Sequence, residues 1–281
     1  MPASKPLKIL IFFLFFLGSS YAQDKPIVLS SIHAYRFLIE AIAGDTVQVD
    51  VLVPDNNKCH HDFEPTPSQI FNALEAKIWF QVGDSYEIHM QKLLDSKDIM
   101  CVDLRKNVEL LKHCHKKCQH EAADPHVWLS PKRLITQANT IKEALITAFP
   151  EKQKHFRVAY EKIATDLENL DRELQELVKN CPKRSMAVSH AAFGYFCSDY
   201  NIEQIAVEED ENESGTFSKL QTIEKLKSSS VKTIFLQNLH NNKAALRIAQ
   251  DLKLNTLTID PQAEDYFSNL RQIAKLFVEE G

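Results

Sequence analysis

The chain has 281 residues, of which 44% are hydrophobic and 25% are charged, and its formal net charge at pH 7 is −5. These proportions are typical of a folded globular protein and exclude a disordered or fibrous chain. The negative charge disfavours binding to nucleic acid and to anionic lipid. The six glycines stand at isolated positions, so the sequence contains no glycine-rich loop for nucleotide phosphates.

Residues 1–22 have the pattern of a secretory signal peptide. Lys5 and Lys8 precede an apolar run over residues 9–17, which is too short to cross a bilayer as a helix, and small residues follow it. We expect cleavage after Ala22 and a periplasmic mature chain without a membrane span, although a short membrane anchor would give a similar pattern. Cleavage removes two lysines and no acid, which changes the net charge from −5 to −7.

From residue 23 to residue 150, short apolar runs alternate with segments of helical period. The runs predict four strands, at 27–31, 48–53, 77–82 and 99–104. Alternation of strands and helices is typical of a parallel sheet with helices on its faces. The sequence therefore predicts an N-terminal α/β lobe over 23–150.

Residues 151–180 predict one long helix. Apolar residues recur there at steps of three and four, without proline or glycine up to residue 179, at Phe156, Tyr160, Ile163, Leu167, Leu170, Leu174 and Leu177. At 1.5 Å per residue such a helix is roughly 40 Å long. We interpret it as a rigid connection packed across two lobes, while a coiled-coil dimer would produce the same apolar stripe.

The strand and helix alternation begins again over residues 181–281. Strands are predicted at 185–189, 202–207, 231–236 and 255–259. The predicted fold class is therefore α/β, with two lobes that each contain a mainly parallel four-stranded sheet flanked by helices, joined by one long rigid helix.

All six cysteines follow Ala22, so they would enter a compartment in which disulfides persist. Six cysteines allow many pairings, and the sequence does not select among them. A bond between Cys181 and Cys197 is favoured because both lie in the C-terminal lobe.

Histidines and an aspartate follow predicted strands in both lobes. His61 follows the strand that ends near residue 53, His126 lies in the stretch DPHVWLSP, and His190 and Asp260 directly follow strands 185–189 and 255–259. Open α/β sheets bind ligands at the carboxyl ends of their strands, so facing lobes would bring these four side chains together. Three imidazoles and one carboxylate suit a divalent transition metal, Zn²⁺ foremost, with Mn²⁺ or Fe²⁺ as alternatives.

Prolines flank the loops that carry the first two of these histidines. Proline fixes φ and holds the preceding residue extended, so such loops lose less entropy when they close on an ion. Pro67 and Pro131 are also suited to open the helices that follow them.

Four stretches resemble a known family. HDFEPTP, DPHVWLSP, SHAAFGYF, and TIDP followed by YFSNL are similar in order and spacing to the ligand-bearing motifs of the metal-binding proteins that serve ABC importers of zinc and manganese. The resemblance covers essentially the whole chain after the signal peptide. It implies a bilobal solute-binding protein, expected to be a monomer, that captures a divalent ion outside the inner membrane and delivers it to a membrane permease.

The resemblance implies His61, His126, His190 and Asp260 as the metal ligands, and it favours His61 over His60. In the family a histidine at the third position goes with zinc, or with less selective proteins, whereas a glutamate goes with manganese. The stretch HCHKKCQH over 113–120 lies where zinc-binding relatives often carry a longer His-rich insertion, and a solvated loop closed by a disulfide would also account for it. After strand 231–236 the chain reads QNL, where the family usually has an acid, a proline and a glutamine.

Two other classes fit part of this pattern. A zinc hydrolase would keep one coordination position for water and use a base such as Glu64, but Asp260 supplies a fourth ligand and no G-x-S-x-G stretch is present. An enzyme is therefore not expected. A metal-binding adhesin of the same fold is the remaining alternative, which metal-dependent uptake would distinguish from a carrier.

Overall fold

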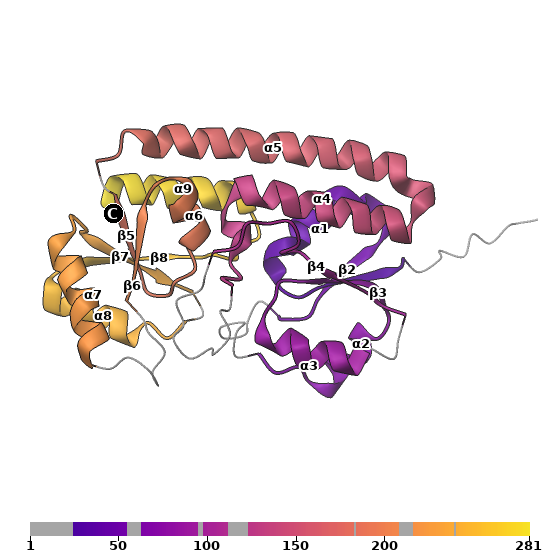
Figure 1. The fold of residues 1–281 in the computed structure, drawn as a ribbon, viewed down its shortest axis with the longest axis horizontal. Helices are drawn as coiled ribbons and strands as arrows, with labels where there is room; N and C mark the ends of the chain where they lie inside the picture. The colour runs from indigo at the N-terminus through magenta and orange to yellow at the C-terminus, as the bar shows by residue number, and fades with distance from the viewer. Residues whose placement is uncertain are drawn as a thin grey trace, which may run out of the picture.

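The computed structural model of the protein describes residues 25–54, 63–94, 98–111, 123–182, 184–207, 216–238 and 240–281. Two lobes lie side by side beneath one long helix (Figure 1). Three features named above lie outside the described residues, namely the expected signal peptide, His61 and the stretch over 113–120.

The N-terminal lobe is built on a parallel sheet of four strands, in the order β2-β1-β3-β4. The strands are β1 (Ile27–Ser30), β2 (Gln48–Val51), β3 (Ala76–Gln81) and β4 (Met100–Asp103). On one face lie α1 (Arg36–Ala43) and α4 (Pro131–Ala148), and on the other lie α2 (Pro67–Ala73) and α3 (Ser85–Leu94) (Figure 1). Short 3-10 turns lie at η1 (His33–Tyr35) and η2 (Gly44–Thr46).

The C-terminal lobe repeats this architecture, with parallel strands in the order β6-β5-β7-β8. The strands are β5 (Ser185–Val188), β6 (Glu203–Ala206), β7 (Thr233–Gln237) and β8 (Asn255–Ile259). On one face lie α6 (Gly194–Asp199) and α9 (Tyr266–Glu280), and on the other lie α7 (Thr216–Ser228) and α8 (Lys243–Leu252) (Figure 1). The predicted fold class is confirmed, and each predicted strand agrees with the structure to within two residues at either end.

The long helix is α5 (Gln153–Lys179), which follows a 3-10 turn, η5 (Pro150–Lys152), and runs along both lobes (Figure 1). It packs against α1 and α4 of the first lobe and α9 of the second. Its buried side chains include Phe156, Ile163, Ala164, Leu167, Leu170, Leu174 and Val178. The apolar stripe is therefore covered within the chain, as expected for a connection packed across the lobes.

The end of this stripe differs from the prediction. Leu177 is 39% exposed, whereas the next residue, Val178, is only 2% exposed. Steps of three and four follow a 3.5-residue period, and a straight helix of 3.6 residues per turn drifts by about 20° per heptad away from it. Over the length of α5 this drift moves the buried position from residue 177 to residue 178.

Two helices begin as their sequences predict. Pro67 is the first residue of α2, and Thr66 before it forms a capping box with Gln69. Pro131 is the first residue of α4, which Ser130 caps by accepting a hydrogen bond from the Arg133 amide. Among the described residues, no helix is both long and apolar enough to cross a membrane.

The favoured disulfide between Cys181 and Cys197 is wrong, because both residues carry free thiols. The two side chains are 3% and 2% exposed and belong to the main hydrophobic core. Burial raises the pKa of the Cys197 thiol, which disfavours the reactive thiolate. Both cysteines therefore act as small apolar core residues.

Candidate metal centre

His126 is held in a fixed orientation on the N-terminal side of the lobe junction. It precedes the 3-10 turn η4 (Val127–Leu129) and is 1% exposed. The Asp124 carboxylate accepts the His126 amide at 2.9 Å and contacts ring nitrogen Nδ1 at 2.7 Å. A carboxylate at Nδ1 keeps the proton on that nitrogen and leaves the Nε2 lone pair to bind an ion, an arrangement common behind metal-binding histidines.

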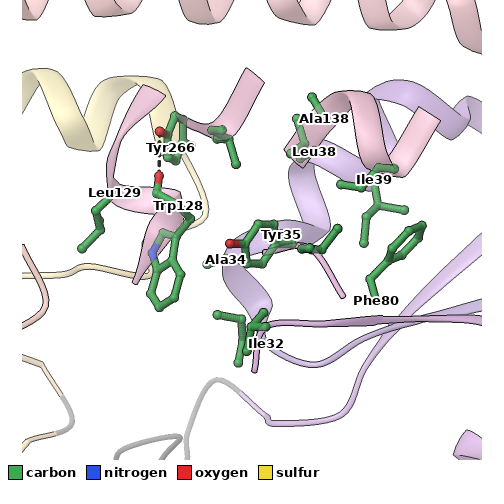
Figure 2. Close-up of a cluster of buried hydrophobic side chains, with 14 of the residues drawn as sticks. Ile32, Ala34, Tyr35, Leu38, Ile39, Phe80, Trp128, Leu129, Ala138 and Tyr266 are labelled. Atoms are coloured by element: carbon green, nitrogen blue, oxygen red, sulfur yellow. Dashed lines mark hydrogen bonds between the residues drawn. The ribbon is translucent and has the colours of Figure 1, made fainter. Parts of the chain in front are cut away.

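Trp128 fixes the same loop and joins it to the C-terminal lobe. Its fully buried ring lies 5.2 Å from the His126 ring, between centres. The indole Nε1 donates to the carbonyl of Pro261 at 2.8 Å. The Tyr266 hydroxyl donates to the Trp128 carbonyl at 2.8 Å (Figure 2). The loop that carries His126 is therefore tied to the segment directly after Asp260.

His190 lies across from His126, directly after β5 and Ser189. Their ring centres are 5.3 Å apart and their planes are inclined by 73°. Two imidazoles that bind one tetrahedral Zn²⁺ through nitrogens at 2.0–2.1 Å have ring centres about 5 Å apart. The spacing of these two rings, one from each lobe, fits a shared ion.

Asp260 follows β8 and is partly buried. Its Oδ1 accepts the amide of Gln262 at 2.9 Å, and its main-chain carbonyl accepts Nδ2 of Asn269 at 2.7 Å. These bonds hold the turn after β8, and the contact between Trp128 and Pro261 places this turn beside the His126 loop.

The four-ligand set remains a prediction, because its first member, His61, lies outside the described residues. Within the described ranges, no three histidine, cysteine, aspartate or glutamate side chains are gathered closely enough to hold an ion. The structure brings His126 and His190 together and joins the Asp260 turn to the His126 loop.

Two residues of the site were not singled out from the sequence. Asp124 orients His126. The sequence signal for this role is the stretch DPH, in which an acid stands two residues before a histidine. The His240 ring stacks on the His190 ring, with centres 4.1 Å apart and planes 25° apart. His240 follows β7. The expectation that candidate ligands follow the carboxyl ends of parallel strands would therefore have selected it as well.

A buried ion pair holds the lobes together beside this site. Arg133 on α4 donates from Nε and Nη2 to the carboxylate of Asp199 on α6, both at 2.9 Å, and these side chains are 12% and 7% exposed. The Ser130 hydroxyl donates to the same carboxylate at 2.6 Å. Nearby, the Tyr195 hydroxyl donates to the carbonyl of Asp124 at 2.7 Å. These contacts fix the C-terminal lobe against the His126 loop.

Comparison with protein families identifies the chain. A family model described as zinc-uptake complex component A, periplasmic, matches residues 28–280. The chain belongs to this family, which confirms the family to which the four sequence motifs pointed.

Individual relatives agree with this assignment. A chain of Chlamydia trachomatis serovar D that carries the provisional name metal-binding protein is 30% identical over 277 residues, which cover 96% of this chain and 99% of the relative. The crystal structure of ZnuA is 29% identical, with a TM-score of 0.83 over 91% of this chain and 98% of that one. A deletion mutant of ZnuA with zinc bound is 28% identical, with a TM-score of 0.84 over 92% and 99% of the two chains.

Proposed function

We propose that the protein is the solute-binding component of an ABC importer, which binds a divalent transition metal between its lobes and delivers it to a membrane permease. The observation that carries this proposal is the pairing of His126 and His190 across the lobe junction at a spacing suited to one ion. Asp124 supports it, because a carboxylate at Nδ1 prepares His126 to bind metal.

The proposed ligands are His61, His126, His190 and Asp260, and the proposed cargo is Zn²⁺, with Mn²⁺ or Fe²⁺ as the alternatives. Neutral imidazoles favour zinc over manganese, which prefers carboxylate and water oxygens. The family description and the zinc-bound ZnuA relative point the same way.

The remaining parts of the proposal concern the setting of the protein. The family is described as periplasmic, which supports export of the chain, and we place the cleavage site after Ala22. We take the mature chain as two lobes, over 23–150 and 181–281, joined by the helix over 151–180. We propose that it acts as a monomer, because the apolar stripe on α5 is covered within the chain. We assign it no catalytic role, and no observation among the described residues favours a hydrolase or an adhesin.

The test is a competitive titration of zinc against manganese, together with elemental analysis of protein purified without chelators. Metal at one hundred times its dissociation constant stabilises the fold by about 2.7 kcal/mol, which thermal unfolding measures. We expect the His61→Ala and His190→Ala variants to lose this shift, while His89→Ala, at an exposed position on α3, retains it. Equal shifts in all variants would contradict the assigned ligands.

Transport is tested separately, in cells. A strain without the gene is expected to need added zinc for growth and to recover with the unmodified gene but not with the His190→Ala form. Growth that is independent of zinc in the deletion strain would contradict an importer component.

A further inference from the structure

Gly194, the first residue of α6, lies directly against the Asp124 carboxylate of the opposite lobe. A Cβ atom at position 194 would stand 2.7 Å from Asp124 Oδ2 and 3.9 Å from its Cγ, and 2.7 Å is well inside van der Waals contact. The positive φ values among the described glycines are those of Gly44 and Gly83, so the backbone at Gly194 is open to any residue. The glycine at this position is therefore explained by the close approach of the carboxylate and not by the turn of the chain.

The Asp124 carboxylate has no room to yield to such an atom. The residue is 4% exposed, its amide donates to the Leu111 carbonyl at 2.9 Å, and its carbonyl accepts the Tyr195 hydroxyl at 2.7 Å. With the main chain held in this way, the carboxylate moves only by rotation of its side chain. Because Oδ1 contacts Nδ1 of His126 at 2.7 Å, that rotation would break the bond that orients the imidazole.

Helix α6 is fixed as well, because both of its ends bond to the N-terminal lobe. At its start, the Tyr195 hydroxyl accepts the Leu111 amide at 3.2 Å, in addition to its bond to Asp124. At its end, the Asp199 carboxylate accepts two hydrogen bonds from Arg133, both at 2.9 Å. Neither side of the contact is free to retreat, and the space that the carboxylate occupies is the space that a side chain on the helix would fill.

We propose that Gly194 is a positioning residue of the metal centre. Because it has no side chain, the C-terminal lobe packs against Asp124 while Asp124 keeps its bond to Nδ1 of His126. A side chain at position 194 displaces the carboxylate, and the proton of the imidazole is then shared between its two nitrogens. The Nε2 lone pair is available to an ion for only part of the time, so the affinity falls. The proposal rests on the proposed function and adds α6 to the elements that prepare the site.

Competition with a zinc chelator tests the proposal on the full chain. Gly194→Ala is expected to weaken zinc binding by about tenfold, the lower end of the range for a lost orienting partner. The control Ser198→Ala, at an exposed position of the same helix, is expected to leave the affinity unchanged. Asp124→Ala removes both the orienting group and the clash, so adding Gly194→Ala to it is expected to change the affinity no further. Losses that simply multiply in the double variant would overturn the proposal.

The imidazole tautomer provides a readout that does not depend on metal. NMR of the imidazole nitrogens in the metal-free protein, at mildly alkaline pH where imidazoles are neutral, shows which nitrogen carries the proton. We expect the proton of His126 on Nδ1 in the unmodified protein and in Ser198→Ala, and on both nitrogens in Gly194→Ala. An unchanged tautomer in Gly194→Ala would overturn the proposal even if the affinity fell.

Urea unfolding of the metal-free variants separates a loss of folding from a loss of positioning. Alanine is a better helix former than glycine, so Gly194→Ala is expected to stay folded. An unfolded Gly194→Ala protein that Asp124→Ala does not restore would overturn the proposal, because the clash would then lie elsewhere. An unmodified protein that binds no zinc would overturn the proposed function, while the tautomer in the metal-free protein would still decide the role of Gly194. The two failures are therefore distinguishable.

Discussion

The two lobes have the same sheet topology but different residues at the ends of their strands. In each lobe a serine directly follows the first strand and donates its amide to a phenylalanine carbonyl in the third, from Ser31 to Phe80 at 3.0 Å and from Ser189 to Phe235 at 2.9 Å. The next residue is Ile32 in the first lobe, which is fully buried, and His190 in the second. The fold sets where the strand ends, and the residue placed there decides whether that position packs into the core, as Ile32 does, or lies against the His126 ring, as His190 does.

The serine side chains differ in a similar way. The Ser31 hydroxyl donates to buried Glu87, which also accepts the amides of Val82 at 2.8 Å and Gly83 at 2.6 Å. In the second lobe the Ser189 hydroxyl accepts the amide of neutral Gln237 at 3.0 Å. The first lobe thus holds its strand ends with a buried acid, whereas the second uses neutral groups beside partly exposed imidazoles. We call the part of the candidate site with His126 and Asp124 the fixed half, because both side chains are buried, and the part with partly exposed His190 the accessible half.

The largest expected effect comes from breaking the contact between the halves. Arg133→Met leaves the buried carboxylate of Asp199 unpaired, which we expect to lower the free energy of unfolding by about 3–5 kcal/mol in urea. Arg271→Met is the matched control, because its ion pair with Glu173 also joins the C-terminal lobe to α5 but is exposed, and it should cost less than about 1 kcal/mol. Equal losses in the two variants would mean that the Arg133 pair does not hold the lobes.

Buried Glu87 in the N-terminal lobe makes a testable contribution to the pH dependence of stability. Burial raises the pKa of Glu87 to about 7 from 4.5, although its hydrogen bonds act in the opposite direction. Between these values the folded protein binds more protons than the unfolded chain, so this contribution to stability is complete below pH 4.5 and is lost as the pH rises through 7. The expected loss is about 3 kcal/mol.

Urea unfolding at several pH values measures this slope. In Glu87→Gln we expect this pH-dependent part of the free energy of unfolding to disappear. The altered hydrogen bonds of the glutamine can lower the free energy of unfolding, but by the same amount at every pH. An identical slope in the variant and the unmodified protein would show that Glu87 titrates normally.

The orienting carboxylate of the fixed half should matter for affinity. Asp124→Asn can no longer hold the proton on Nδ1 of His126 as a carboxylate does, so zinc binding is expected to weaken by about 10–100-fold. Competition with a chelator measures the affinity, and Asp45→Asn, at an exposed acid, is the control. An Asp124→Asn protein with unchanged affinity would remove His126 from the ligand set.

The smallest effect is expected in the accessible half. Gln237→Ala removes the hydrogen bond to the carbonyl of His190, which is worth about 1 kcal/mol, or about fivefold in zinc affinity. The same chelator competition measures it. A larger loss here than in Asp124→Asn would reverse the assignment of the fixed and accessible halves.

The fold could be predicted from the sequence because both lobes follow simple periodic rules. Each strand is a short apolar run, and α5 has an unbroken apolar stripe without proline or glycine. The shift from Leu177 to Val178 could not be read from the steps alone, because it depends on how a straight helix drifts across two packed lobes. The pairing of Cys181 with Cys197 failed because proximity in the sequence does not determine whether two thiols in one core meet.

The site was predicted in part. His126 and His190 were expected because histidines that follow parallel strands gather at one edge, and the structure places their rings together. The role of Asp124 could not be predicted, since a residue that only supports a histidine has no periodic signature in the sequence. His240 could not be predicted from the resemblance, because its loop departs from the pattern of the family. His61 and the stretch over 113–120 stay predictions.

The central claim is that one zinc ion binds between His126 and His190, from opposite lobes. Anomalous diffraction at the zinc edge from crystals of the zinc-loaded protein tests it most directly. The account predicts one strong peak at about 2.0–2.1 Å from a nitrogen of each ring, with Asp260 and His61 completing the shell. A peak that lies only at the 113–120 stretch or elsewhere, with these two rings not bound to metal, would contradict it.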